Sequence, residues 1–206
     1  MVLQKDSLMH SLYEIETTVK RSSRAKGLSW GLSEEAGKAV RLLEQSEFQG
    51  LESFKRLIDL GLSGLNKLLD INQSDTSNLC PIHFGIFFLD QSHNEDIHRS
   101  HNFKNLNEPL LILPFLSKSA KNNLLYFHFH SSNLNFTISP GDIYFFDQNI
   151  FPEYISDFSI SITTQRKSIY SQSTWDYLYK LSLETFVEET EEKKISGAGA
   201  GLTDND

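Results

Sequence analysis

The sequence predicts an α+β protein: a helical N-terminal segment, a central, mainly antiparallel sheet, and a C-terminal helix followed by an extended tail. Three observations lead to this prediction. In the first seventy or so residues, apolar side chains recur every three or four positions, which is the spacing of amphipathic helices. Beyond residue 82 the apolar segments become short and are separated by turn residues, which is typical of antiparallel strands. Helical spacing returns from residue 173, and we expect a single α+β domain over residues 1–206.

Residues 1–71 are expected to form a helical subdomain. Ser11 and Glu14 have the spacing of a capping box, in which each residue satisfies a backbone N–H of the other at a helix start. The helix that they begin should run to about Ala25 and end at Gly27, because glycine readily leaves the helical conformation.

A second helix is expected to begin near Ser33, where the two glutamates that follow would favour the positive end of the helix dipole. Within it, Gly37 should allow a neighbouring helix to approach closely. A third helical stretch is expected over residues 51–69, with a break around 61–64.

Residues 82–166 are expected to be the β-rich part, reached through a polar connector. Residues 131–133 and the stretch Ser-Pro-Gly-Asp at 139–142 predict hairpin turns. Residues 91–108, rich in His and Asn, are expected to be a loop. The predicted strands cover residues 82–89, 110–115, 124–130, 134–138, 143–146 and 158–164.

The end of the chain combines a helix with a segment that has little to bury. A helix is expected over residues 173–194, and residues 195–206, ISGAGAGLTDND, form the predicted tail. Three alternate glycines would let this backbone lie close to a surface, so we hypothesise that the tail packs against the body and helps line the functional site.

Charge and composition exclude some classes of partner. The net charge is −8, all of it from residues after 70, so the chain lacks the basic excess that binding to nucleic acid needs. No apolar run is long enough for a membrane span or a secretory signal, and the single cysteine, Cys80, cannot form an internal disulfide. We therefore expect a cytoplasmic protein without a nucleic-acid or membrane partner.

The sharpest arrangement of chemically capable residues is the segment YFHFH. On a strand, alternate side chains share a face, so His128 and His130 would point the same way and could grip one metal ion. The segment also resembles the first metal-binding motif of cupins, but Asn135 stands where that motif has a carboxylate. Asparagine is a poor substitute for a carboxylate on a cation, so a polar sheet face is favoured over a metal centre, and no cofactor is expected.

A second candidate is a basic corner. Arg24 and Lys26 lead into the start of the second helix, where a phosphate or carboxylate could bind, and Trp30 could stack on such a ligand. The acceptor groups of the tail residues Asp204, Asn205 and Asp206 are opposite in charge to this corner and could dock there. Against an anion site, cations at the end of the first helix are stabilised by its dipole without a ligand.

Other candidates are weaker. His93, His98 and His101 have no metal-binding spacing that can be recognised, and Cys80 has no evident base. The sequence holds no nucleophile elbow, phosphate-binding loop or dinucleotide fingerprint.

The stretch SLYEIETTVKRSSRAKGLSWGLSEEAGKAVRLL, residues 11–43, is similar to the opening of an uncharacterised bacterial family, a domain of unknown function. The shared features are a Ser-Leu-x-Glu-Ile-Glu helix, a basic stretch, a Gly-x-x-Trp-Gly-Leu turn and a Glu-Glu-Ala-Gly helix. The final GAGAGLTDND also resembles the ending of that family. The resemblance implies no reaction.

Three functions remain open. The favoured one is a small-molecule-binding protein or enzyme with an anionic ligand. The first alternative is a non-catalytic accessory subunit that docks on a partner enzyme. The second alternative is a cupin-like metalloprotein that uses His128 and His130.

Overall fold

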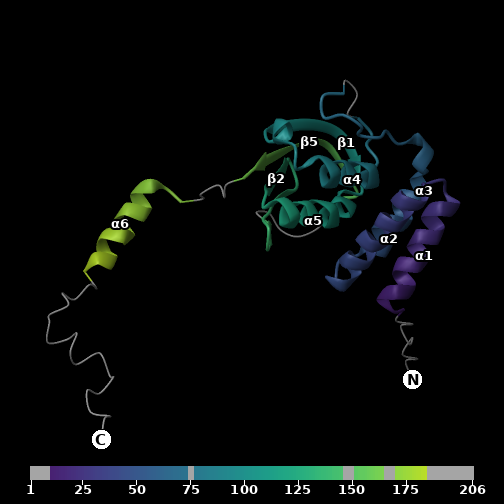
Figure 1. Ribbon diagram of the computed structural model, residues 1–206, viewed down its shortest axis with the longest axis horizontal. Coiled ribbons are helices and arrows are strands. Elements are labelled where there is room, and N and C mark those ends of the chain that lie inside the picture. The colour runs from purple at the N-terminus through teal and green to yellow at the C-terminus, as the bar shows by residue number, and fades with distance from the viewer. Residues whose placement is uncertain (1–9, 74–76, 146–150, 165–169, 185–206) are drawn as a thin grey trace, which may run out of the picture. The chain divides into compact units, whose positions relative to one another are not determined.

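The computed structural model describes residues 10–73, 77–145, 151–164 and 170–184 (Figure 1). The chain divides into two units, residues 1–166 and 167–206, and each is described by itself. In the described residues, helices at both ends of the chain flank an antiparallel sheet, which confirms the predicted α+β class.

The α-helices are α1 (Leu12–Ala25), α2 (Trp30–Gln45), α3 (Gly50–Leu60), α4 (Pro81–Gln91), α5 (Leu113–Asn123) and α6 (Gln172–Leu183). The 3₁₀ helices are η1 (Leu62–Gly64), η2 (Glu95–Ile97) and η3 (Pro109–Ile112). The strands are β1 (Ser100–Asn107), β2 (Tyr126–Ser131), β3 (Asn135–Ile138), β4 (Ile143–Phe145) and β5 (Tyr154–Thr163).

Helix α1 begins and ends where the sequence predicts. The Ser11 hydroxyl accepts a hydrogen bond from the Glu14 N–H (3.2 Å), and the Glu14 carboxylate accepts one from the Ser11 N–H (2.8 Å). At the other end, Gly27 has a φ of 100°, a conformation that favours glycine and stops the helix.

Helix α2 lies beside α1 (Figure 1) but begins earlier than predicted. It starts at Trp30 rather than near Ser33, because the Ser29 hydroxyl accepts a hydrogen bond from the Leu32 N–H and caps the helix. The close approach predicted at Gly37 is confirmed, since a Cβ there would lie 2.7 Å from the carbonyl oxygen of Glu16. The third helix ends at Leu60, where the break is predicted, and η1 follows it; the predicted helical continuation over residues 65–69 is wrong, because no helix forms there.

The sheet has the strand order β1-β5-β2-β3-β4, and all neighbours are antiparallel. Two of its turns are the predicted ones. Ser131 closes the β2–β3 turn by hydrogen bonds with Leu134, and Ser139 closes the β3–β4 turn by accepting a hydrogen bond from the Asp142 N–H (3.0 Å). The last strand begins at Tyr154, earlier than predicted.

Two predicted strands are helices. Residues 82–89 belong to α4, and residues 110–115 belong to η3 and α5. Both segments are continuous apolar runs, for which periodicity cannot distinguish a buried strand from a buried helix. The signals that favour helix are Pro81, Pro109 and Pro114, each within the first two positions of a helix, where the missing N–H costs nothing.

The predicted loop over residues 91–108 is also wrong. It contains η2 and β1, and β1 pairs with β5 from Ser100 to Asn107. Sequence alternation is weak here because the inward positions include His101 beside Phe103 and Leu106. The paired residues of β1 and β5 are between 47 (Asn107 and Tyr154) and 61 (Ser100 and Ser161) positions apart, a long-range contact that the local sequence does not reveal.

The core lies between one face of the sheet and helices α4 and α5. Phe84 of α4 meets Phe103 and Phe158 of the sheet at ring-centroid distances of 5.0 and 5.7 Å, and Phe88 meets Phe127 at 6.1 Å. Helices α1 to α3 form a further layer, in which α2 contacts α4 and α5, and α3 contacts η3. The result is that, within the first unit, the described helices α1 to α5 lie on one side of the sheet.

The second unit contains α6. This helix begins at Gln172, one residue before the predicted start, because the Ser171 hydroxyl accepts a hydrogen bond from the Thr174 N–H (3.1 Å). The described helix ends at Leu183. The remainder of the predicted helix from residue 185, and the tail at 195–206, lie outside the described residues.

Candidate ligand site on the open face of the sheet

The strands separate apolar from polar side chains between the two faces of the sheet. In β2, Phe127 and Phe129 are buried against the helices. On the opposite side, His128 is half-buried and His130 is exposed. Both imidazoles therefore lie on one face, as alternation predicts. We call this uncovered side the open face.

Strand pairing places polar residues of four strands in one row across the open face. Asn102 of β1 is opposite Ser159 of β5, Ser159 is opposite His130 of β2, and His130 is opposite Asn135 of β3. Cross-strand neighbours have Cβ atoms about 5 Å apart, so a small molecule could contact several members of this row at once.

Asn135 orients the imidazole of His130. The His130 Nδ1 and the Asn135 Oδ1 form a hydrogen bond in which the amide oxygen is the acceptor. Nδ1 is then the protonated nitrogen of the neutral ring, and Nε2 offers a lone pair. The arrangement supplies a fixed hydrogen-bond acceptor on the open face.

His128 is held in the next row. Its Nδ1 lies 3.0 Å from the Thr137 hydroxyl of β3, and its Nε2 lies 3.5 Å from the Thr163 hydroxyl of β5. The ring thus bridges β3 and β5 across its own strand, which gives it a structural role.

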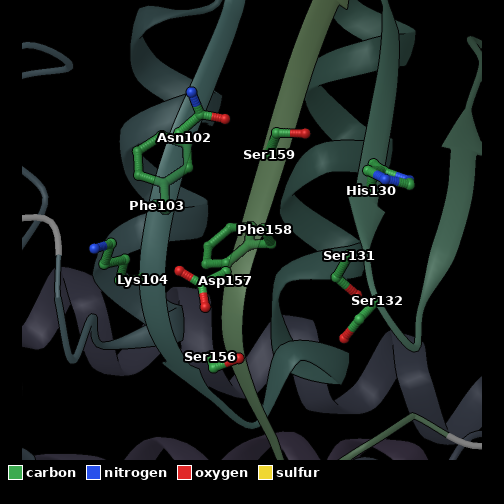
Figure 2. A pocket seen from close by; sticks show the side chains of 10 residues that line it. All are labelled: Asn102, Phe103, Lys104, His130, Ser131, Ser132, Ser156, Asp157, Phe158 and Ser159. Atoms are coloured by element: carbon green, nitrogen blue, oxygen red, sulfur yellow. The ribbon is translucent and has the colours of Figure 1, made fainter.

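A shallow hollow of about 750 Å³ lies on the open face around His130. This volume is within the range of small-molecule sites. Figure 2 looks onto the hollow, with helices behind the strands and the Ser159 hydroxyl pointing from β5 toward β2. It is lined by Asn102, Phe103, Lys104, His130, Ser131, Ser132, Ser156, Asp157, Phe158 and Ser159.

One cationic and one anionic side chain stand together at the end of the hollow. Lys104 of β1 is the cross-strand neighbour of Asp157 of β5, and both are exposed. Next to Lys104, Asn105 has a φ of 55°, which interrupts the alternation so that Leu106 is buried. This left-handed residue marks the end of the regular polar face.

The described residues do not gather a metal-binding set. Among them, no group of three or more His, Cys, Asp or Glu side chains lies close enough to hold an ion. Cupins are eight-stranded jelly rolls, whereas the sheet that carries His128 and His130 has five described strands and a helical layer. The histidine pair therefore lacks the surroundings that the cupin resemblance implies.

The predicted basic corner is occupied by contacts within the chain. The Arg24 guanidinium donates a hydrogen bond to the Leu28 carbonyl (2.8 Å) and stacks over the Trp30 ring, 5.3 Å from its centroid. Trp30 is 62% exposed, so it is not the core residue that a tryptophan at a helix corner often is. Lys26 is exposed at the end of α1. Asp204, Asn205 and Asp206 lie outside the described residues.

The contacts of His98 and His101, and the burial of Cys80, indicate structural roles. His98 and His101 each bond a backbone carbonyl, of Ser92 (2.8 Å) and Ile97 (2.9 Å) respectively. Burial raises the pKa of the Cys80 thiol, which disfavours the thiolate needed of a nucleophile. Burial lowers the pKa of His83.

One buried polar cluster has no signal in the sequence. Glu108 is 2% exposed and accepts two hydrogen bonds from Arg56 (2.7 and 2.9 Å) and one from the Ser53 hydroxyl (2.5 Å). This carboxylate raises the pKa of Arg56 and joins α3 to the segment after β1. Since Glu108 is 55 positions from Ser53 and 52 positions from Arg56, spacing could not reveal the cluster.

Comparison with known proteins matches the helical part of the chain. Residues 10–96 match a family described as a protein of unknown function, DUF3726. The DUF3726 match includes residues 11–43 and confirms the resemblance to an uncharacterised family. It extends from α1 into η2, so the basic corner lies within it and the hollow on the open face lies beyond it. No curated protein and no solved structure matches the chain.

None of the helices in the described residues has both the length and the apolar character that crossing a membrane requires.

Proposed function

We propose that this protein binds a small polar molecule in the hollow on the open face of its sheet. The observation that carries the proposal is the row of polar side chains from four strands, centred on a histidine that Asn135 orients. A face with no ligand needs no oriented acceptor, whereas a binding site depends on polar groups held in position by their neighbours.

The chemistry of the lining indicates a ligand with both hydrogen-bond donors and acceptors. The His130 Nε2 and the Asp157 carboxylate accept hydrogen bonds, the Lys104 ammonium donates them, and Ser159 does both. Among the described residues that line the hollow, the two with a formal charge, Lys104 and Asp157, are of opposite sign, so the hollow suits a neutral or zwitterionic molecule better than a polyanion.

The anionic ligand predicted from the basic corner is the less supported form of the proposal. Arg24 already has a carbonyl and an aromatic ring as partners, so an anion would have to compete with both. Lys26, like Arg24, is exposed there.

The proposal is tested by NMR titration of the ¹⁵N-labelled full chain with a panel of polar metabolites, including amino acids, sugars and dicarboxylates. We expect at least one compound to shift the backbone signals of β1, β2 and β5 around the hollow, and not those of α1 and α2. Shifts at Arg24 and Lys26 instead would place the ligand at the basic corner. The absence of any saturable shift across the panel would contradict the proposal.

A matched pair of variants sharpens the test. Ser159 lines the hollow and Ser161 does not, although both are half-buried on the same face of the same strand. Ser159→Leu should fill the hollow and abolish the titration, whereas Ser161→Leu should leave it nearly unchanged. Equal loss in both variants would mean that binding does not depend on the hollow.

A further inference from the structure

A second hollow, of about 520 Å³, lies beside the C-terminal end of α4, and we call it the α4 hollow. It is lined by residues of the segment 69–72, of α4 and of the segment 94–99, and it shares no lining residue with the hollow on the open face. Its volume is within the range of small-molecule sites. Eight of its ten lining residues fall within residues 10–96, so most of the α4 hollow belongs to the part of the chain that matches DUF3726.

Three charged side chains line the α4 hollow, namely the carboxylates of Asp70 and Asp96 and the guanidinium of Arg99. Although they have opposite signs, none of the three takes part in an ion pair between described residues. Charged groups that surround one hollow without pairing with each other keep their capacity for charge-assisted hydrogen bonds. A ligand that carries both a positive and a negative group could therefore bind to both kinds of charge.

Two asparagines hold the charged residues in position. The Asn72 N–H donates a hydrogen bond to the Asp70 Oδ1 (2.7 Å), and the Asn72 Oδ1 accepts one from the Arg99 Nη2 (2.9 Å). The Asp96 N–H donates to the Asn94 Oδ1 (3.0 Å), which caps η2. Since a guanidinium has five N–H donors, the bond to Asn72 leaves Arg99 with donors for a carboxylate.

The α4 hollow also has apolar walls. Phe87 of α4 and Ile97 of η2 are buried residues that line it, and Leu69 and Ile71 line it from the segment before α4. An apolar group that packs here is removed from water, which favours binding.

Charges of both signs beside apolar walls define one class of ligand. We propose that the α4 hollow binds a small zwitterion with an apolar side group, such as an apolar amino acid. Its ammonium group would lie against Asp70 and Asp96, and its carboxylate against Arg99. This inference goes beyond the proposed function and does not depend on the ligand site on the open face.

The first experiment tests the ligand class. Isothermal titration calorimetry of the full chain uses leucine, methionine and phenylalanine as probes. The controls are the corresponding amines, which lack the carboxylate, the corresponding carboxylic acids, which lack the ammonium group, and glycine, which lacks the apolar group. We expect saturable binding of at least one probe and binding at least about tenfold weaker for each of its controls. No binding of any probe, or equal binding of a control, would overturn the proposal.

The second experiment assigns the charges with matched variants. Asp70→Asn/Asp96→Asn removes both carboxylate charges and keeps the shape of the side chains. The control Asp90→Asn/Glu95→Gln removes two exposed carboxylates nearby that do not line the hollow. Affinity should fall at least about tenfold in the first variant and in Arg99→Gln, and change less than about twofold in the control. No loss in either hollow variant, or an equal loss in the control, would overturn the proposal.

The third experiment locates the ligand. In NMR spectra of the ¹⁵N-labelled full chain, the bound amino acid should shift the backbone signals of residues 69–72 and 87–99. Shifts confined to β2 and β5 would overturn this proposal and support the site on the open face instead, so the two proposals can fail separately.

Discussion

The two faces of the sheet use the same strands for different purposes. On the covered face, Phe129 stacks on Phe158, and the rings of Phe158 and Phe127 meet Phe84 and Phe88 of α4. On the open face, the alternate positions of the same strands carry histidine, serine and asparagine. The difference places core packing and the proposed ligand site on alternate residues, so we expect that either can change without the other.

The largest expected effect is on the covered face. Phe127 is fully buried and meets the ring of Phe88, so Phe127→Ala should lower the free energy of unfolding by about 3–5 kcal/mol. Urea denaturation followed by circular dichroism measures this change. A loss below about 1 kcal/mol would show that the covered face is not the core described here.

The buried carboxylate of Glu108 tests the contrast between an apolar face that stabilises the fold and a polar face that does not. A large loss of stability on its removal would show that polar groups also stabilise the fold. Glu108→Ala leaves Ser53 without its acceptor and removes both Arg56 hydrogen bonds, but Arg56 keeps an ion pair with Glu153 (3.4 Å) and its side chain is 34% exposed, so water can reach it. We expect a loss of about 2 kcal/mol in the same denaturation experiment.

A matched control for this variant is Lys55, the residue of α3 just before Arg56. Lys55 forms an ion pair with Asp59 at 2.7 Å, and both side chains are well exposed. Lys55→Ala should change the free energy of unfolding by less than about 0.5 kcal/mol. Equal losses in the two variants would mean that burial of Glu108 is not what matters.

The basic corner tests whether the open face is the site at all. Arg24→Ala removes a hydrogen bond to Leu28 and a cation–π contact with Trp30, for an expected loss of about 1 kcal/mol. Phosphate should raise the melting temperature of the wild type and of Arg24→Ala/Lys26→Ala equally if the corner is only a helix end. A rise confined to the wild type would move the ligand site from the sheet to the helices.

A small effect on stability is expected one residue away from the site of the largest one. His128 is on the open face, and His128→Ala should lower the free energy of unfolding by less than about 1 kcal/mol, although it removes the link to Thr137. Comparison with Phe127→Ala, one residue away, measures the difference between the two faces directly. Similar losses in both variants would contradict the separation of roles.

The sequence predicts local features well where the signal is local. The Ser11 capping box, the close approach at Gly37 and the alternation through His128 and His130 all depend on residues within a few positions of one another. The run PIHFGIFFLD that forms α4 is apolar on all sides. The spacing of its apolar residues therefore cannot distinguish a helix from a strand, and only Pro81 indicates a helix.

The site could be predicted only in part, because it is assembled by strand order. His130 is a candidate from sequence, but the other members of its row come from distant strands. Ser159 of β5 pairs with His130, and Asn102 of β1 pairs with Ser159, because β5 lies between β1 and β2 in the sheet. Asn102 falls in a segment whose pattern predicts a loop. Long-range pairing of this kind is a property of the whole fold and leaves no periodic trace in either strand.

The edge position of β1 has a consequence for how the protein behaves at high concentration. An edge strand exposes unpaired N–H and C=O groups, on which a strand of another molecule can add and begin aggregation. Here the Leu79 N–H donates to the carbonyl of Asn105 (3.1 Å), the left-handed Asn105 disturbs the extended backbone, and Lys104 adds a charge. Together these features make the edge a poor template for further strands, so this half of the sheet is protected from intermolecular growth.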